Sequence, residues 1–232
     1  MNMQSVKEIP ITLSHLFETV HHVKKIERGS FLFQEGGQAE ELFIIQSGIL
    51  QLSKIIPDGR ELTLRMCNSG DFVGELNLFS PGSRYLLSAR VIESGEVAVI
   101  MKDELEEKLS QDLPLAFEFI RWMSLQYRKT QTKFRDLVLH GKKGALYSTL
   151  IRICNSYGIN TKHGILINIP LTNQELANFC GTSREVVNRL LSDLRKNGII
   201  SISKGAITIH DIDYLKLEID CEDCPVEICK VD

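Results

Sequence analysis

Three cysteines lie within nine residues of one another in the stretch CEDCPVEICKVD. Cys221 and Cys224 have C-x-x-C spacing, and Cys229 follows after four more residues. This spacing brings three soft thiolates within reach of one centre, which suits zinc or an iron–sulfur cluster. Three cysteines leave a fourth position to fill, and the spacing alone does not separate the two metals. An acidic tail with incidental thiols is the alternative without metal.

The other three cysteines, Cys67, Cys154 and Cys180, stand alone on apolar segments and are predicted to be buried packing residues. No run of about 18 apolar residues and no signal-peptide pattern is present, so we expect a cytoplasmic protein with no membrane segment. In a reducing cytosol a thiol cluster favours metal or redox chemistry over structural disulfides.

The net charge of −3 averages over two opposite regions of the 232-residue chain. Residues 211–232 carry eight acidic side chains against two lysines, whereas residues 121–143 carry seven Lys or Arg against one Asp. A basic body with an acidic tail fits a polyanion partner. Solvated surface faces explain the same charges equally well, so motifs must decide.

Residues 171–200 have the pattern of two short helices joined by a tight turn. The sequence T-x-x-E, which satisfies exposed amides at a helix start, begins at Thr172 and again at Thr182. Gly181 is expected in the turn, and Gly198 at the end of the second helix.

The second helix of this pair has one apolar and one polar face. The apolar positions are Val186, Val187, Leu190, Leu191 and Leu194. The polar face opens with Arg184, Glu185, Asn188 and Arg189. Arginine suits guanine O6 and N7, and glutamate accepts from cytosine N4. Two strand-like runs around residues 204–205 then predict a wing. A winged helix-turn-helix is therefore favoured over a helical hairpin with a solvated face.

Residues from about 31 to 100 alternate short apolar runs with glycine-containing turns, which predicts an antiparallel β-roll. Helical periodicity follows from residue 103. A heptad seam then runs through Ile120, Met123, Tyr127, Thr130, Phe134 and Leu137. A seam this long favours a dimer contact over an internal core stripe. Residues 140–144 are predicted as a hinge before a second helix at 145–157.

The order of β-roll, long heptad helix and winged helix-turn-helix resembles the CRP/FNR superfamily of bacterial transcription regulators. The resemblance covers nearly the whole chain and implies an α+β protein. It implies a cyclic-nucleotide-binding-like β-roll at 1–110, a dimerisation helix at 111–140, the DNA-binding domain at 141–217 and a cysteine-rich tail at 218–232.

In that family the recognition helix carries an Arg-Glu-x-x-x-Arg pattern for TGTGA-type half-sites. The matching residues are Arg184, Glu185 and Arg189.

The family's cyclic-nucleotide pocket follows a Gly-Glu-Leu segment, here residues 74–76, with an Arg-Ser pair that binds the phosphate. Alignment places Tyr85 and Leu86 at that pair, and neither side chain neutralises a phosphate. A shifted register would place Ser83 and Arg84 there instead, so a cyclic-nucleotide regulator stays an alternative.

The chain also resembles Bacillus-type FNR proteins, which carry a carboxy-terminal Cys-x-x-Cys-x4-Cys motif and no amino-terminal cysteine cluster. This resemblance implies an oxygen-sensitive [4Fe-4S] cluster held by Cys221, Cys224 and Cys229, with an aspartate as fourth ligand.

Asp136 is favoured as that aspartate, because the family places its ligand near the end of the dimer helix. Between Glu118 and Glu175 it is the only carboxylate. The alternative is that Asp136 merely pairs on the helix surface with Lys133, Arg135 or His140. Other candidate ligands are His140, Asp220, Asp223 and Asp232.

We therefore expect a homodimeric, oxygen-responsive activator that binds a palindromic site on double-stranded DNA and recruits RNA polymerase. No catalytic constellation is evident. The rivals are a cyclic-nucleotide regulator and a zinc-stabilised interaction module whose helix-turn-helix only packs.

Overall fold

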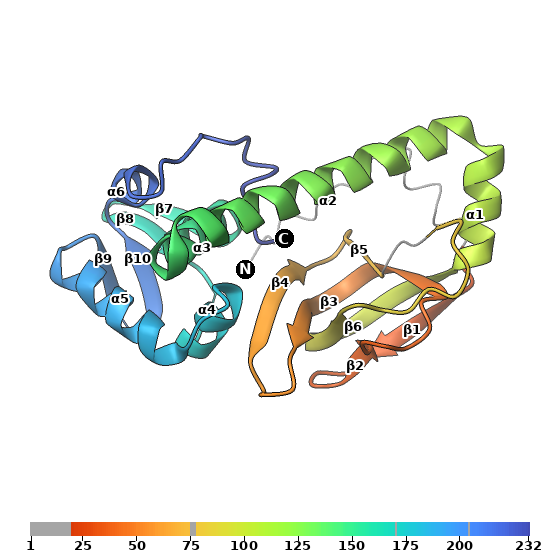
Figure 1. Cartoon of the computed structure of the whole chain (residues 1–232), viewed down its shortest axis with the longest axis horizontal. Helices are drawn as coiled ribbons and strands as arrows, with labels where there is room; N and C mark the ends of the chain where they lie inside the picture. Colours follow the sequence, from red (N-terminus) through yellow and green to blue (C-terminus); the bar gives the residue numbers. More distant parts are fainter. Residues whose placement is uncertain (1–19, 75–77, 170, 204) are drawn as a thin grey trace. The chain divides into compact units, whose positions relative to one another are not determined.

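The computed structural model describes residues 20–74, 78–169, 171–203 and 205–232 (Figure 1). The chain divides into two compact units, the first made of Met1–Ile55 with Arg65–Ser124 and the second of Ile56–Leu64 with Leu125–Asp232. The division passes through one strand, β4, and one helix, α2.

The first unit is the predicted β-roll, an antiparallel sheet with the strand order β1-β6-β3-β4. Strand β2 pairs with β6, and β5 pairs with β3. The bounds are β1 His22–Ile26, β2 Phe31–Phe33, β3 Glu41–Ile55, β4 Glu61–Cys67, β5 Phe72–Val73 and β6 Ser88–Met101.

Alternation along the two longest strands builds two hydrophobic cores, because successive side chains of a strand point to opposite faces. Phe43 and Ile45 of β3 lie in the core inside the roll, which also contains Val97 and Val99 of β6. Their neighbours Leu42, Ile44, Ala98 and Ile100 lie in the second core, with residues of the following helices.

Glycine permits the close crossing of β3 and β6 near their middle. A Cβ atom on Gly95 would lie 2.1 Å from the carbonyl oxygen of Ser47, so no other residue fits there without moving the backbone. Register shifts between Ile45 and Leu50 accompany this contact and bend the pair into the roll.

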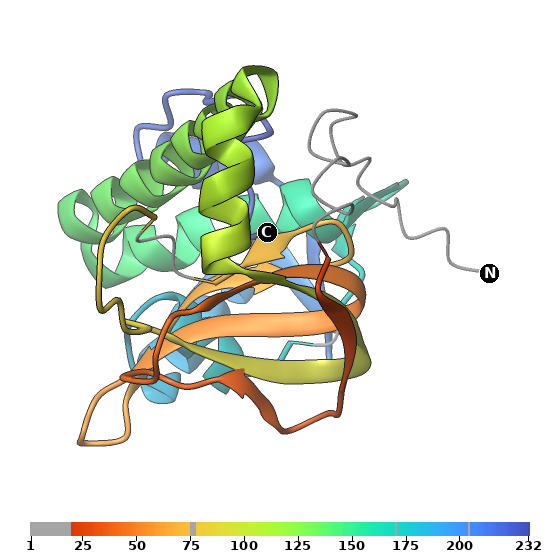
Figure 2. The ribbon, with the colours of Figure 1, turned by 90° about the vertical axis from the view of Figure 1, so that its right-hand side faces the viewer.

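Helix α1, Lys102–Gln111, closes one side of the roll (Figure 2). Leu105 and Leu109 of α1, with Leu115 and Phe119 from the start of the next helix, pack in the second core. That next helix, α2, spans Leu113–Leu139 and contains the predicted seam.

The second unit combines the end of α2 with α3, Gly141–Tyr157, and a sheet of order β7-β8-β10-β9. The strands are β7 Gly158–Thr161, β8 Gly164–Ile167, β9 Ile200–Ser203 and β10 Ala206–Ile209. The paired strands β9 and β10 form the predicted wing, although residue 204 at its tip lies outside the described residues.

The predicted hinge at 140–144 is wrong in extent, because α3 begins at Gly141 and four of the five residues are helical. The break is confined to His140 and Gly141, where Gly141 has φ +58°. Gly144 has a packing role: a Cβ there would lie 2.0 Å from that of His140. Its lack of a side chain leaves room for the side chain of His140, the residue that precedes α3, which explains a glycine inside this helix.

The helix-turn-helix consists of α4, Asn173–Phe179, and α5, Arg184–Lys196, and α6, Ile212–Leu217, follows the wing. Thr172 forms the predicted capping box with Glu175. The second predicted box is wrong, because Ser183 rather than Thr182 caps α5 and accepts from the Val186 amide. The turn glycine Gly181 has φ +57°, as its predicted position requires.

Candidate DNA interface and cysteine-rich tail

The polar face of α5 points to solvent. Its predicted base-reading residues, Arg184, Glu185, Asn188 and Arg189, are all exposed. Val187, Leu191 and Leu194 are buried on the opposite face, while Val186 and Leu190 are only partly buried. The helix is therefore anchored by its apolar side and presents donors and acceptors outward.

Two of these side chains are oriented by groups at helix starts. The Asn173 amide, at the first position of α4, donates to Oδ1 of Asn188 over 2.5 Å. Backbone amide and Ser183 hydrogen bonds at the start of α5 lower the pKa of Glu185, so its carboxylate stays an acceptor. Asn173 is a positioning residue that the sequence pattern did not reveal, because its partner is on another helix.

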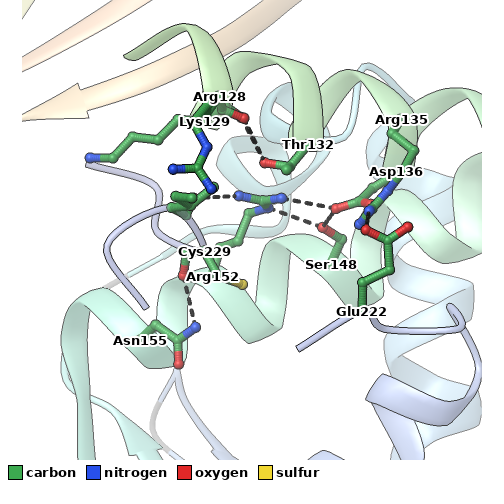
Figure 3. A network of polar contacts seen from close by, with 11 residues as sticks. Arg128, Lys129, Thr132, Arg135, Asp136, Ser148, Arg152, Asn155, Glu222 and Cys229 are labelled. Atoms are coloured by element: carbon green, nitrogen blue, oxygen red, sulfur yellow. Dashed lines mark hydrogen bonds and ion pairs between the residues drawn. The ribbon is translucent and has the colours of Figure 1, made fainter. Parts of the chain in front are cut away.

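Asp136 of α2 is buried and accepts hydrogen bonds on both carboxylate oxygens (Figure 3). Oδ1 accepts from Nε of Arg135 at 3.0 Å and from its terminal nitrogen at 2.8 Å. Oδ2 accepts from the Ser148 hydroxyl at 2.5 Å and from Arg152 at 3.0 Å. Burial raises the pKa of this carboxyl, but the bonds from Ser148, Arg152 and Arg135 outweigh burial, so its pKa is lowered overall.

Arg152 of α3 connects this carboxylate to the tail. Its guanidinium donates to Asp136, to the Ser148 hydroxyl at 3.1 Å and to the backbone carbonyl of Ile228 at 3.1 Å. Ile228 directly precedes Cys229, so one buried cation links the predicted fourth ligand to the backbone beside the last cysteine (Figure 3).

Residues 228–232 dock along the same face of α3. Asn155 donates to the carbonyl of Cys229 at 2.7 Å. The hydroxyl of Ser156 donates to Oδ1 of Asp232 at 2.7 Å and accepts from the Val231 amide at 3.1 Å. Lys129 of α2 donates to a main-chain oxygen of Asp232 at 2.5 Å. The end of the tail is therefore held by side chains of two helices.

The cysteines divide into two classes. Cys67, Cys154 and Cys180 are buried, as predicted, and burial raises the pKa of Cys154 to about 12 and of Cys180 to about 11. The tail cysteines, Cys221, Cys224 and Cys229, are partly exposed. Burial also raises the pKa of Cys229, and the charge of Arg152 opposes it.

Across the described part of the chain, no three His, Cys, Asp or Glu side chains gather at one centre. Two arginines connect Asp136 to the tail. Arg152 binds Asp136 and the Ile228 carbonyl, and Arg135 binds Asp136 and forms an ion pair with Glu222. The donor set nevertheless fits an iron–sulfur cluster chemically, because three thiols share one short segment and a carboxylate lies one arginine away.

Two of the other candidate ligands, Asp223 and Asp232, have partners of their own. Asp223 pairs with Lys216 at 3.0 Å, and Asp232 binds Ser156 and Lys129. Asp220 has a positive φ of 45° at the start of the tail. His140 lies at the break between α2 and α3. The predicted surface partners of Asp136 included Arg135, which does bind it, but Ser148 and Arg152 were not foreseen.

Comparison with known proteins identifies the family. The profile of the cyclic nucleotide-binding domain matches residues 23–112, and that of the Crp-like helix-turn-helix domain matches residues 145–217. The "Anaerobic regulatory protein" of Bacillus subtilis is 55% identical over 100% of both chains. The chain belongs to the CRP/FNR family of transcription regulators.

Two further similarities agree with this family. The cAMP-activated global transcriptional regulator of Pseudomonas aeruginosa is 32% identical, covering 85% of this chain and 94% of that protein. The structure of the c-di-GMP responsive global regulator of Xanthomonas campestris superimposes with a TM-score of 0.75 at 24% identity, covering 86% and 98% of the two chains. The second match concerns the fold alone.

The CRP/FNR β-roll of this chain has an aromatic core where the family's phosphate-binding pair is aligned. Tyr85 is buried against Phe33, and its hydroxyl donates to the carbonyl of Glu41 at 3.1 Å. Arg84 is exposed and donates to the carbonyl of Gly36 at 2.6 Å. Glu75 and Leu76 of the aligned Gly-Glu-Leu segment lie outside the described residues.

The predicted seam on α2 is largely exposed in the single chain. The exposed fractions are 59% for Ile120, 39% for Met123, 64% for Tyr127 and 67% for Phe134, whereas Leu137 is partly buried. The exposed apolar set also includes Leu113, Phe117, Val138 and Leu139, which the heptad pattern did not include. A helical membrane span is not found among the described residues.

Proposed function

We propose that this CRP/FNR protein is an oxygen-responsive activator of anaerobic gene expression. In this proposal Cys221, Cys224, Cys229 and Asp136 hold a [4Fe-4S] cluster, and the loaded protein binds a TGTGA-type palindrome as a homodimer and recruits RNA polymerase.

One observation carries the proposal: buried Arg152 bonds both the carboxylate of Asp136 and the backbone carbonyl beside Cys229. Because one arginine binds both the carboxylate and the thiol-rich segment, it holds one oxygen donor and three sulfur donors in the same region, as ligation of a single cluster requires. The relative in Bacillus subtilis, which matches over its full length, is named for anaerobic regulation and supports the same physiological role.

The cluster supplies an iron–sulfur centre that reacts with oxygen. The three tail cysteines and Asp136 would supply the ligands, and Arg152 connects the tail to α2 within the second unit. Carboxylate oxygen is a harder donor than thiolate and a poorer match to iron–sulfur, so ligation by Asp136 would be weaker than ligation by a fourth cysteine. Because Asp136 is on α2 and the thiols are on the tail, ligation by both ties the tail to the helix that carries the seam.

The DNA-binding part of the proposal rests on α5. Arg184 and Arg189 are exposed and have the reach for bidentate guanine contacts, and ionised Glu185 is an acceptor for cytosine N4. Two copies of this helix in a symmetric dimer match a palindromic site. The exposed apolar side chains of α2 are the surface that such a dimer would bury.

The competing functions differ in their metal and ligand. A zinc-stabilised interaction module would use the same thiols, but it would leave the exposed basic face of α5 without a role. A cyclic-nucleotide regulator requires a cation beside the phosphate, and the buried Tyr85 lies at the aligned position.

The experiment is isolation of the full chain without oxygen. We expect a brown protein with broad absorbance near ~400 nm that air bleaches, containing iron and sulfide. Serine at Cys221, Cys224 or Cys229 should abolish both contents, whereas Cys154→Ala should keep them, because that thiol is buried and is not part of the Cys-x-x-Cys-x4-Cys motif. A colourless protein containing zinc would contradict the proposal.

The ligand role of Asp136 has its own test. Asp136→Ala should reduce cluster retention and DNA-dependent transcription, whereas Asp136→Cys should keep the cluster and slow its loss in air. Full iron and sulfide in Asp136→Ala, with normal activation, would reject Asp136 and turn attention to the tail carboxylates.

A further inference from the structure

The carboxylate of Asp136 has no spare acceptor capacity. Arg135 donates twice to Oδ1, and Ser148 and Arg152 each donate once to Oδ2. A carboxylate offers about four lone-pair sites, so these four hydrogen bonds saturate it. Any iron bound by Asp136 must therefore displace a donor.

The two arginines at this carboxylate are held very differently. The Arg152 side chain is 4% exposed and has two further acceptors, Ser148 and the carbonyl of Ile228. Displacing it would leave a buried guanidinium without its carboxylate, which is strongly unfavourable. The side chain of Arg135 is 25% exposed and already has a second anionic partner, Glu222.

Glu222 is an alternative anionic partner for Arg135. Its side chain is 65% exposed, and Glu222 follows Cys221 directly in the sequence. Figure 3 shows Glu222 beside Arg135 and Asp136. Arg135 can release Oδ1 of Asp136 and keep its ion pair with Glu222, so its charge stays paired throughout. The released oxygen is on the side where Arg135 meets the cysteine segment.

We propose that these arginines have opposite roles: Arg135 is a movable cap on Oδ1 of Asp136, and Arg152 is a fixed positioning residue. Transfer of Arg135 to Glu222 frees the carboxylate oxygen for iron, while Arg152 and Ser148 keep Oδ2 in place. Arg152 also holds the backbone next to Cys229. This inference rests on the proposed function, since it concerns how the same ligands become available.

The roles predict opposite effects of removing each guanidinium. Arg135→Gln should speed anaerobic reconstitution with ferrous iron and sulfide by at least about tenfold, because the two charge-assisted hydrogen bonds from Arg135 to Oδ1 no longer have to break and each is worth about that factor. Arg152→Gln should lower the final iron and sulfide content, because Asp136 and the tail lose their common anchor. Glu222→Gln should slow reconstitution, because Arg135 then has no anionic partner to accept it.

A second readout needs no cluster. In chelator-treated full-length protein, iodoacetamide should alkylate Cys229 several-fold faster in Arg152→Lys than in the wild type, measured by mass spectrometry, because lysine keeps the charge but not the forked donors that anchor Asp136 and Ile228 together. Arg135→Gln should leave that rate unchanged, since Arg135 does not bind residues 228–232 in the structure.

The outcomes separate this inference from the proposed function. If tail cysteine variants lose iron while both arginine variants reconstitute like the wild type, the arginine roles are wrong and the cluster proposal stands. Equal losses in Arg135→Gln and Arg152→Gln would also overturn it, because both would then be simple supports. If the wild type takes up no iron and sulfide, the proposed function fails and this inference fails with it. If Arg152→Gln does not fold, Arg152→Lys replaces it, with the same expected loss of cluster, because lysine lacks the forked donors that reach Asp136 and Ile228 together.

Discussion

The ring of Tyr85 stacks on the ring of Phe33, with centroids 3.9 Å apart and 15° between the planes. Both side chains are buried in the core of the β-roll. In the register favoured from the sequence, Tyr85 lies where the resemblance implies a phosphate-binding residue. Here that position supports the domain's own packing.

This stack leads to a stability prediction. Tyr85→Ala should lower the free energy of unfolding by about 3–5 kcal/mol, as expected for a large aromatic removed from a core. Leu86→Ala, at a neighbouring side chain that is 65% exposed, should change it by less than about 0.5 kcal/mol. Urea denaturation measures both. Similar small effects at the two positions would mean that Tyr85 is not part of the core.

The packing of Tyr85 against Phe33 also predicts that cyclic AMP does not bind the β-roll. Cyclic AMP at about 1 mM should leave the melting temperature of the wild type unchanged, because a ligand stabilises only a protein that binds it. A clear rise in melting temperature would revive the cyclic-nucleotide alternative.

Base reading by α5 is tested by comparing specific and random DNA. Arg184→Ala or Arg189→Ala should weaken binding to the TGTGA-type site by about 1–3 kcal/mol and affect random DNA much less. Arg195→Ala is the matched control, because this exposed arginine lies in the last turn of the same helix. Equal losses on both DNAs would reduce Arg184 and Arg189 to phosphate contacts.

The exposed seam of α2 is tested by placing a charge on it. Ile120→Glu or Tyr127→Glu would bury an unpaired carboxylate between helices, so dimerisation and palindrome binding should fail together. Arg121→Glu changes a neighbouring side chain that is 80% exposed and should leave the dimer intact. An unchanged dimer of the seam variants in sedimentation would place the interface elsewhere.

The sequence predicted the elements and turns that depend on local residue patterns. It did not predict the side-chain contacts that form only when helices pack together. The β-roll, the capping box at Thr172 and the turn at Gly181 follow from alternation, spacing and backbone preference, and all are present. Helical spacing predicts partners of Asp136 among its neighbours on α2, and Arg135 is one of them. Ser148 and Arg152, 12 and 16 residues further on, reach it only because α2 and α3 pack together.

Helix α3 begins at Gly141, four residues before the predicted start at residue 145, and packing again explains the difference. A glycine-rich segment was interpreted as a hinge, but Gly144 is where the backbone approaches His140. The sequence shows that a position carries glycine. It does not show whether glycine is there for backbone flexibility or because a neighbouring group leaves no room for a side chain.

Lys133 of α2 offers a prediction about pH. Its ammonium donates to the carbonyls of Thr63 and Leu64 at 2.8 and 3.1 Å, and lies 5.2 Å from the centre of the Phe179 ring. Burial, together with the nearby charge of Arg152, lowers the pKa of Lys133 to about 7 from an ordinary value of 10.5. Keeping this lysine protonated in the folded state is therefore unfavourable.

The direction of the pH effect follows from proton counting. Between about pH 7 and 10.5 the unfolded chain keeps the Lys133 proton and the folded chain releases it, so the free energy of unfolding rises with pH. Below pH 7 both states are protonated and the contribution is constant. Lys133→Met removes the effect. Urea denaturation from pH 7 to 9 should show the wild type gaining stability relative to Lys133→Met, by at most about 1.4 kcal/mol per pH unit. Lys142→Met, at an exposed position of α3, controls for the loss of one positive charge. Parallel curves for the wild type and Lys133→Met would mean that the two backbone carbonyls and the Phe179 ring keep the ammonium charged throughout this range.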